Sequence, residues 1–268
     1  IGKHNLSKHN LTFRETSVLL NSRLKLDGSM NLMRQVVKNK PTVGGFYMNP
    51  LVGLYRFPRG EDIAYYKENF EVYDEGRNLS IQNWHTSYED FEQNPYWITN
   101  RILSKENRMH VIVSLSANLK INDWLSLQAR GNVDYINDKV RQQFYASTAP
   151  ALAGANGRYI EMDYQETQYY GDAILMMKKQ WDAFSLNAAL GVSINDKTVN
   201  STRYDSKTAS LKYANVFNLA NIIMNGSAGL DQKIDARRQL QSLFATAQLG
   251  YNEFVYLDLS ARNDWSST

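Results

Sequence analysis

Hydrophobic and polar side chains alternate along several stretches of the chain with a period of two residues. In the clearest stretch, Trp124–Tyr135, Leu, Ala, Gly, Val and Tyr alternate with Ser, Gln, Arg, Asn and Asp. Because successive side chains of a β-strand point to opposite faces, this pattern predicts a strand with one apolar and one polar face. The same alternation places strands at Leu11–Phe13, Leu24–Leu32, Met109–Ile121, Trp124–Asp138, Tyr164–Lys179, Phe184–Ile194, Ser242–Tyr251 and Val255–Arg262.

The connections between these strands alternate between short and long. Short turns are expected near Asn21, Asn122, Trp181 and Asn252. Long connections are expected over Val37–Asn107, Lys139–Met162 and Asn195–Ala236, with a short helix within Glu61–Phe70. A structureless loop as long as the first is unusual in a compact soluble domain. Short turns at one end of a sheet and long loops at the other are typical of outer-membrane barrels.

Two arrangements can bury the apolar face of such strands. A soluble sheet packs it into a protein core, whereas a transmembrane barrel exposes it to lipid and lines a water-filled lumen with the polar face. Aromatic residues gather at the short-turn end, at Trp124, Trp181, Phe184, Tyr251 and Phe254. Aromatic belts favour the membrane–water interface, although strand ends in any β protein can carry aromatic residues. We therefore predict an all-β fold, an antiparallel transmembrane β-barrel segment.

A soluble β-sandwich that binds carbohydrate is the alternative. It would bury Leu115, Leu127, Leu186 and Leu190 against a second sheet, whereas the barrel would leave them on an outer surface. The 12% aromatic content, with 17 Tyr, suits a β-rich chain in either case. A net charge of +3 does not favour a nucleic-acid partner, and the lack of Cys excludes disulfides and Cys-ligated metals. The sequence has no apolar run of about 18 residues, so we expect no transmembrane helix.

No catalytic or metal-binding motif occurs in the sequence. Its four histidines, His4, His9, His85 and His110, are scattered, and no phosphate-binding or nucleophile motif is present. The carboxylates of Glu89, Asp90 and Glu92 match no calcium loop and are expected in a solvated loop. We therefore expect a protein that is not an enzyme and has neither a cofactor nor a metal.

Several segments resemble the SusC/RagA family of TonB-dependent outer-membrane transporters, and they follow one another along the chain in the same order as in that family. The most specific is Tyr256–Ser267, which reads YLDLSARNDWSS. Asn94–Trp97 forms an Asn-Pro-Tyr-Trp motif that Asn100 and Arg101 follow. The other matching segments are His9–Arg14, Leu24–Leu32 and Asp123–Gly131.

The resemblance implies that residues 1–268 are about eight strands of a 22-stranded barrel, with short periplasmic turns and long extracellular loops. The plug domain, the TonB-contacting segment and the other strands are expected outside this chain. The implied function is import of a bulky nutrient, a glycan or a peptide, across a bacterial outer membrane. The implied partners are membrane lipid, a SusD-like surface lipoprotein, and TonB through the absent N-terminal region. A passive pore and an adhesin or scaffold barrel remain as alternatives.

Two groups of residues are candidates for the functional site. Flat aromatic rings beside amides suit a sugar or peptide ligand, which makes Trp84, Asn94, Tyr96 and Trp97 candidate substrate contacts. The other interpretation is that Pro95–Trp97 holds the loop against the barrel wall or the plug. The second group is expected to face the lumen, where opposite charges on adjacent strands can pair with each other or with a plug. It comprises Lys25, Asp27, Arg130, Asp134, Asp172, Lys178, Asp258 and Arg262.

Overall fold

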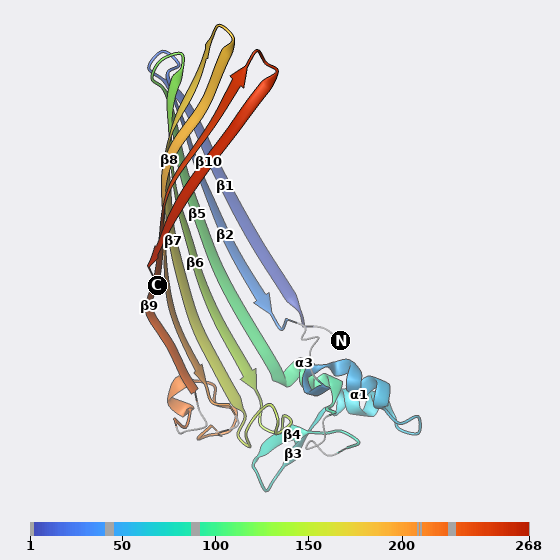
Figure 1. Cartoon of the computed structure of the whole chain (residues 1–268). Helices are drawn as coiled ribbons and strands as arrows, with labels where there is room; N and C mark the ends of the chain where they lie inside the picture. The colour runs from blue at the N-terminus through green and yellow to red at the C-terminus, as the bar shows by residue number, and fades with distance from the viewer. Residues whose placement is uncertain are drawn as a thin grey trace.

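Eight long strands form a single antiparallel sheet in the computed structural model, which describes residues 3–40, 46–86, 92–207, 209, 211–224 and 229–267. Each strand pairs with its neighbours in sequence order, apart from a small hairpin inserted between β2 and β5 (Figure 1). The all-β, antiparallel prediction is therefore confirmed. The strands of the sheet are β1 (Asn5–Leu19), β2 (Leu24–Lys38), β5 (Ile102–Lys120), β6 (Leu125–Phe144), β7 (Arg158–Trp181), β8 (Phe184–Asp205), β9 (Gly229–Tyr251) and β10 (Val255–Ser267).

The strands are longer than their hydrophobic alternation predicted. β1 was expected only at Leu11–Phe13 but has 15 residues, and β6 continues past Asp138 to Phe144. Beyond the apolar part of each strand both faces are largely polar, so the alternation ends while the backbone hydrogen bonds continue. The predicted long connections were too long for the same reason.

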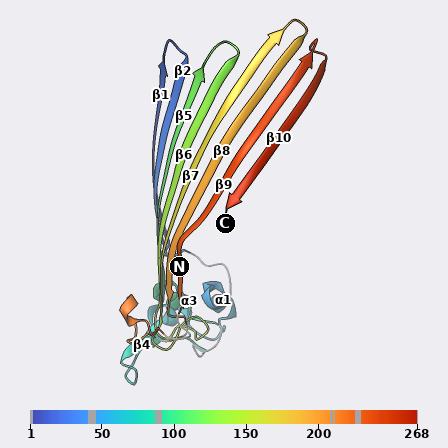
Figure 2. The same cartoon turned by 60° about the vertical axis from the view of Figure 1, so that its left-hand side comes forward.

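The two ends of the sheet differ, as the turn pattern predicted. Tight turns join the strands at one end, where the backbones of Asn21, Asp182 and Asn252 have positive φ angles. At the Asn122 turn, the side chain accepts hydrogen bonds from the backbone N–H groups of Trp124 and Leu125. The sheet is twisted, so the strands are seen side by side at the loop end in Figure 1 and at the short-turn end in Figure 2.

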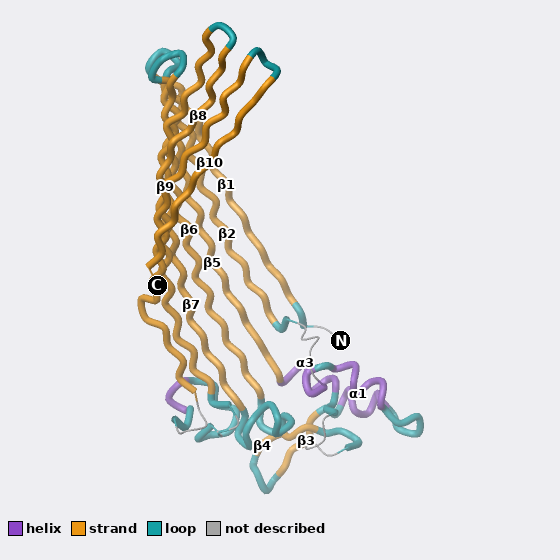
Figure 3. Tube along the Cα trace, in the orientation of Figure 1, coloured by secondary structure: helices purple, strands orange, loops and turns teal. Residues whose placement is uncertain are grey.

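A layer of short elements covers the opposite end of the sheet (Figure 3). Helix α2 lies within the predicted helical stretch Glu61–Phe70, whereas α1, α3 and the β3–β4 hairpin were not predicted. None of the described helices is long and apolar enough to cross a membrane. The elements of this loop layer are η1 (Phe46–Met48), α1 (Pro50–Arg56), α2 (Ile63–Glu68), β3 (Glu71–Asp74), β4 (Leu79–Gln82), α3 (Pro95–Arg101) and η2 (Leu219–Asn221).

The strand register gathers the apolar side chains on one face of the sheet. One cross-strand row consists of Leu24, Leu119, Leu127, Leu175 and Leu190. In the described chain no second sheet covers this face, and the exposed fractions of Leu115 and Leu190 are 58% and 52%. The sandwich alternative required these leucines to be buried, so the structure contradicts it. The clusters of buried apolar residues lie instead in the loop layer and the adjoining strand ends.

The apolar face forms a band with aromatic residues at both ends. The short-turn end carries the predicted aromatic residues, and a second set lies at the far end, at Phe13, Tyr135, Tyr169 and Trp265. Tyr169 and Trp181, on β7, are twelve positions apart. This corresponds to about 40 Å along a strand, or about 30 Å across a membrane if the strand tilts by ~40°. The band therefore matches the ~30 Å hydrocarbon core of a bilayer.

One glycine in the loop layer allows a precise test of the fold. Gly157 has a φ of +98°, and a Cβ there would lie 2.5 Å from the carbonyl oxygen of Phe144. Gly157→Ala should therefore destabilise the complete protein by about 1–3 kcal/mol, measured by thermal unfolding in detergent micelles. Gly131→Ala is the matched control, because a Cβ at Gly131 meets nothing within 4 Å. Equal stability of the two variants would contradict this loop geometry.

Candidate functional site

All of the predicted lumen residues lie on the face of the sheet opposite the apolar band. Register places Asp27 and Arg130 in one cross-strand row with Asp172. Ser116 on β5 lies between Asp27 and Arg130, and the row continues through Ser193 and Ser242 to Asp264. An uninterrupted row of charged and hydroxyl side chains therefore crosses seven strands of this polar face.

Charge pairs join neighbouring strands across the polar face, as predicted. Arg130 Nη2 lies 2.7 Å from Asp172 Oδ2, and the Asp172 side chain is almost fully buried. His110 Nε2 lies 2.7 Å from Asp134 Oδ1. These two cross-strand pairs link β6 to β7 and β5 to β6, and they support the register of those strands.

The remaining predicted lumen residues lie toward the short-turn half or the last strand. Lys25 Nζ is 3.6 Å from Asp27 Oδ2 on the same strand. Asp258 accepts a hydrogen bond from Gln248 at 2.8 Å, and Arg262 donates to Asp264 at 2.9 Å. Lys178 is directly opposite Asn187 on β8. The structure thus spreads this group along the sheet and does not form one compact site from it.

A motif that was not predicted from the sequence is repeated on β7. Three tyrosines each donate a hydrogen bond to a carboxylate two residues later, and a base on an adjacent strand pairs with the same carboxylate. The three sets are Tyr159–Glu161–Arg141, Tyr164–Glu166–Lys197 and Tyr170–Asp172–Arg130. Burial, and then the hydrogen bond to Glu161, raise the pKa of Tyr159 to about 12. The sequence signal for this motif is Tyr-x-Asp/Glu within a strand, because residues two positions apart share a face of the strand and can form a hydrogen bond.

The Asn-Pro-Tyr-Trp motif is embedded in the loop layer. Asn94 is fully buried, and its side chain accepts from the backbone N–H of Tyr96 at the start of α3. The same side chain donates to the carbonyl oxygens of Tyr66 and Asn83 at 2.9 and 2.8 Å. Asparagine before proline is a signature of a helix start, and Asn49-Pro50 repeats it at α1.

The candidate aromatic residues mainly support the loop. Trp97 is fully buried and donates its indole N–H to Thr148 Oγ1 at 3.1 Å. The Trp84 ring is also buried, with its centroid 5.2 Å from that of Phe57. Trp84 and Trp97 therefore anchor the loop, and for Trp97 this agrees with the second interpretation, in which Pro95–Trp97 holds the loop in place. Substrate contact stays a prediction, with Tyr96 the one of the four candidates whose side chain is only half-buried.

One of the acidic residues expected in a solvated loop is instead buried. Glu92 is only 4% exposed, with Oε2 2.6 Å from Arg56 Nε and Oε1 3.1 Å from His85 Nε2. A carboxylate buried in this way requires a charged partner, which Arg56 supplies. Glu89 and Asp90 lie outside the described residues. No cluster of three or more His, Cys, Asp or Glu side chains suited to a metal occurs in the part of the chain that the structure describes.

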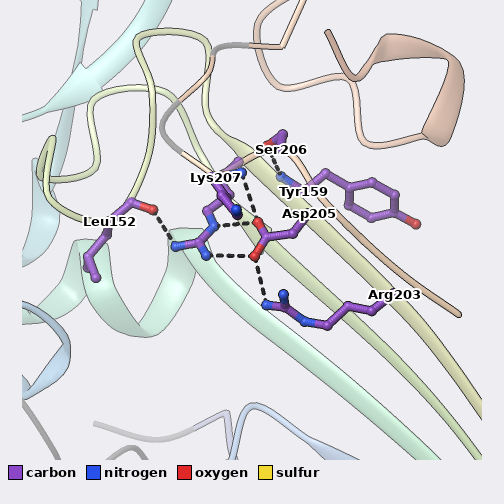
Figure 4. A network of polar contacts seen from close by, with 7 residues as sticks. Leu152, Tyr159, Arg203, Asp205, Ser206 and Lys207 are labelled. Atoms are coloured by element: carbon purple, nitrogen blue, oxygen red, sulfur yellow. Dashed lines mark hydrogen bonds and ion pairs between the residues drawn. The ribbon is translucent and has the colours of Figure 1, made fainter. Parts of the chain in front are cut away.

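A second buried acid ties the strand ends to the loop layer (Figure 4). Asp205, at the end of β8, is 2% exposed and receives two hydrogen bonds from Arg158 at 2.8 and 2.9 Å. Arg203 and the backbone N–H of Lys207 donate to the same carboxylate at 2.7 and 2.8 Å. Arg158 also donates to the carbonyl oxygen of Leu152 at 2.9 Å. This network fixes the ends of β7 and β8 against the loop that follows β6.

Two cavities lie close to these groups. One, of about 780 Å³, lies along strands β1, β2 and β5–β7, and its lining includes Arg14, Ser29, Asn132 and Tyr170. The other, of about 510 Å³, lies where α1 and α3 meet the ends of β5 and β6. Guanidinium, amide and hydroxyl groups in the first cavity can form hydrogen bonds with a hydroxylated or amide-bearing ligand.

Comparison with known proteins shows a similarity of fold. No family model matches the sequence, and no curated protein matches it. Among solved structures, the chain is similar to the RagAB peptide transporter with a TM-score of 0.67 and 16% identity, over 98% of this chain and 28% of that chain.

Two solved receptors show a weaker likeness. The siderophore receptor PiuA from Acinetobacter baumannii has a TM-score of 0.52 at 10% identity, over 98% of this chain and 36% of its own. The ferric-catecholate import receptor Fiu from Escherichia coli K12 has a TM-score of 0.51 at 12% identity, over 98% of this chain and 34% of its own.

These matches support the TonB-dependent receptor fold, and the proteins that share it here are transporters and receptors, not enzymes. The chain spans only about a third of their length.

The Asp205 network predicts a pH-dependent loop. Burial acts to raise the pKa of Asp205, but the hydrogen bonds from Arg158 and Lys207 N–H and the charges of Arg158 and Arg203 together lower it below the usual value. A carboxylate whose pKa is lower in the folded state stabilises that state at pH values above its unfolded pKa of about 3.9. This stabilisation is lost as the pH falls through the folded-state pKa. The backbone N–H groups of Tyr159 and Ser206 should therefore lose hydrogen-exchange protection below about pH 4.

At neutral pH, Asp205→Asn should remove the same protection, because it leaves two arginines without their carboxylate. The expected local cost is about 3 kcal/mol, typical of a broken buried ion pair. Asp163→Asn is the control, because the Lys139–Asp163 pair is exposed and worth less than about 1 kcal/mol. Unchanged exchange in Asp205→Asn at neutral pH would rule out this role for the network.

Proposed function

We propose that this chain forms part of the wall of an outer-membrane importer. The observation that carries the proposal is the two-faced sheet, whose apolar band has the thickness of a bilayer and whose opposite face carries paired charges. In a closed barrel the band contacts lipid and the polar face lines the lumen. The short turns then lie on the periplasmic side and the loop layer on the extracellular side.

The sheet needs further strands to meet this role. β1 and β10 are the two edges, so each pairs on one side only. Unpaired backbone groups cost several kcal/mol each in hydrocarbon, which is why strands cross membranes in closed barrels. Strands from the rest of the protein would pair with both edges and complete the barrel.

We further propose that the cargo is a peptide or an oligosaccharide. The similarity to a peptide transporter favours a peptide, and the glycan alternative comes from the resemblance of the sequence segments to SusC/RagA transporters. The 780 Å³ cavity, with its amide, hydroxyl and guanidinium groups, offers the polar contacts that either cargo requires. A SusD-like lipoprotein would meet the loop layer, and TonB would supply the energy through a plug domain outside this chain.

Uptake experiments distinguish import from the alternatives. Cells that lack the gene should lose uptake of labelled peptides or oligosaccharides, and a protonophore should abolish uptake in wild-type cells, because TonB draws on the proton gradient of the inner membrane. Uptake that persists with the protonophore would indicate a passive pore. Uptake that is unchanged in the deletion strain would indicate an adhesin or scaffold barrel.

A further inference from the structure

Three cations lie side by side on the apolar side of the sheet, beyond the band and toward the loop layer. Lys38 on β2 is directly opposite Lys105 on β5, which in turn is directly opposite Arg141 on β6. All three are exposed, and we call them the basic row. Like charges opposite one another on neighbouring strands repel, with Cβ atoms about 5 Å apart. The sheet alone therefore does not account for this arrangement.

Nearby carboxylates leave most of this charge unneutralised. Glu161 is the next residue in the row and pairs with Arg141 at 3.1 Å. Within the described residues, no ion pair reaches Lys38 or Lys105, nor Arg34, which lies four residues before Lys38 on the same face. The row therefore presents an exposed excess of positive charge suited to an anionic ligand.

The position of the row indicates what kind of anion it meets. Lys38 is six positions beyond Leu32, which lies in the last mainly apolar row. This is about 20 Å along the strand, or about 15 Å from the hydrocarbon if the strand tilts by ~40°. Phospholipid headgroups occupy only about 5–8 Å on each side of a bilayer. Arg34 falls within that layer, at about 5 Å, whereas the basic row lies beyond it.

We propose that the basic row binds the phosphate groups of a lipid with a phosphorylated saccharide headgroup, in the leaflet on the loop-layer side. A saccharide headgroup extends beyond the phospholipid layer and can carry phosphates to the height of the row. Lysine binds phosphate as a point charge and arginine binds it through two parallel hydrogen bonds. The acyl chains of the same lipid would lie on the apolar band directly below. The inference rests on the proposed placement of that band in hydrocarbon.

The test measures binding of purified lipopolysaccharide to the complete protein in phosphatidylcholine nanodiscs. The triple variant Lys38→Gln/Lys105→Gln/Arg141→Gln should bind about 100-fold more weakly than wild type. Each cation near an anionic surface contributes about 1 kcal/mol to binding, and three such contributions correspond to this loss of affinity. Lys38→Arg/Lys105→Arg keeps the charge and should bind like wild type. The control Arg23→Gln/Lys120→Gln/Lys179→Gln removes equal charge at the short-turn end and should leave binding unchanged.

A second comparison uses only the wild-type protein, so it is decisive even if the triple variant does not fold. Dephosphorylated lipopolysaccharide should bind as weakly as the triple variant binds the intact lipid. The inference is overturned if phosphorylated and dephosphorylated lipids bind equally, if phosphatidylglycerol binds as tightly, or if millimolar inorganic phosphate displaces the lipid completely. Failure of the wild-type protein to enter nanodiscs would contradict the proposed function instead.

Discussion

The strand register is the constraint on which this structure depends. Residues that are directly opposite one another in a sheet share a face, so seven consecutive strand pairings keep every leucine of the band on one side. A slip of one residue in any pairing would place leucines among the charges and charges within the band. The Arg130–Asp172 pair and its neighbours oppose such a slip, because their partners are correct only in this register.

The same register explains why the protein has its core at one end. The apolar face of the sheet is left uncovered, and the clusters of buried apolar side chains among the described residues are found where the loops fold over the strand ends. There the burial of Trp97, Asn94 and Asp205 gives the loop layer a defined structure in place of the long irregular loops that the sequence indicated. The loop layer therefore presents a defined surface at one end of the sheet.

Much of the sheet was predictable because alternation is a local signal. Leu186 to Ile194 alternates so regularly that only one register can gather its apolar residues on one face. The polar ends of the strands were not predictable, because Lys139 and Arg141 resemble loop residues until their partners on β5 and β7 are known. The role of Asp205 was also hidden, because it depends on Arg158, which is 47 residues away.

Leu190 and Asn187 lie three positions apart on β8, on opposite faces of the sheet. Cysteine labelling at these two positions of the complete protein in a bilayer tests the account most directly. The Leu190→Cys variant should react with a lipid-soluble maleimide and resist a membrane-impermeant one, whereas Asn187→Cys should react with the impermeant reagent. Protection of Leu190→Cys from both reagents, or its reaction with the impermeant one, would contradict the placement of the apolar band in lipid.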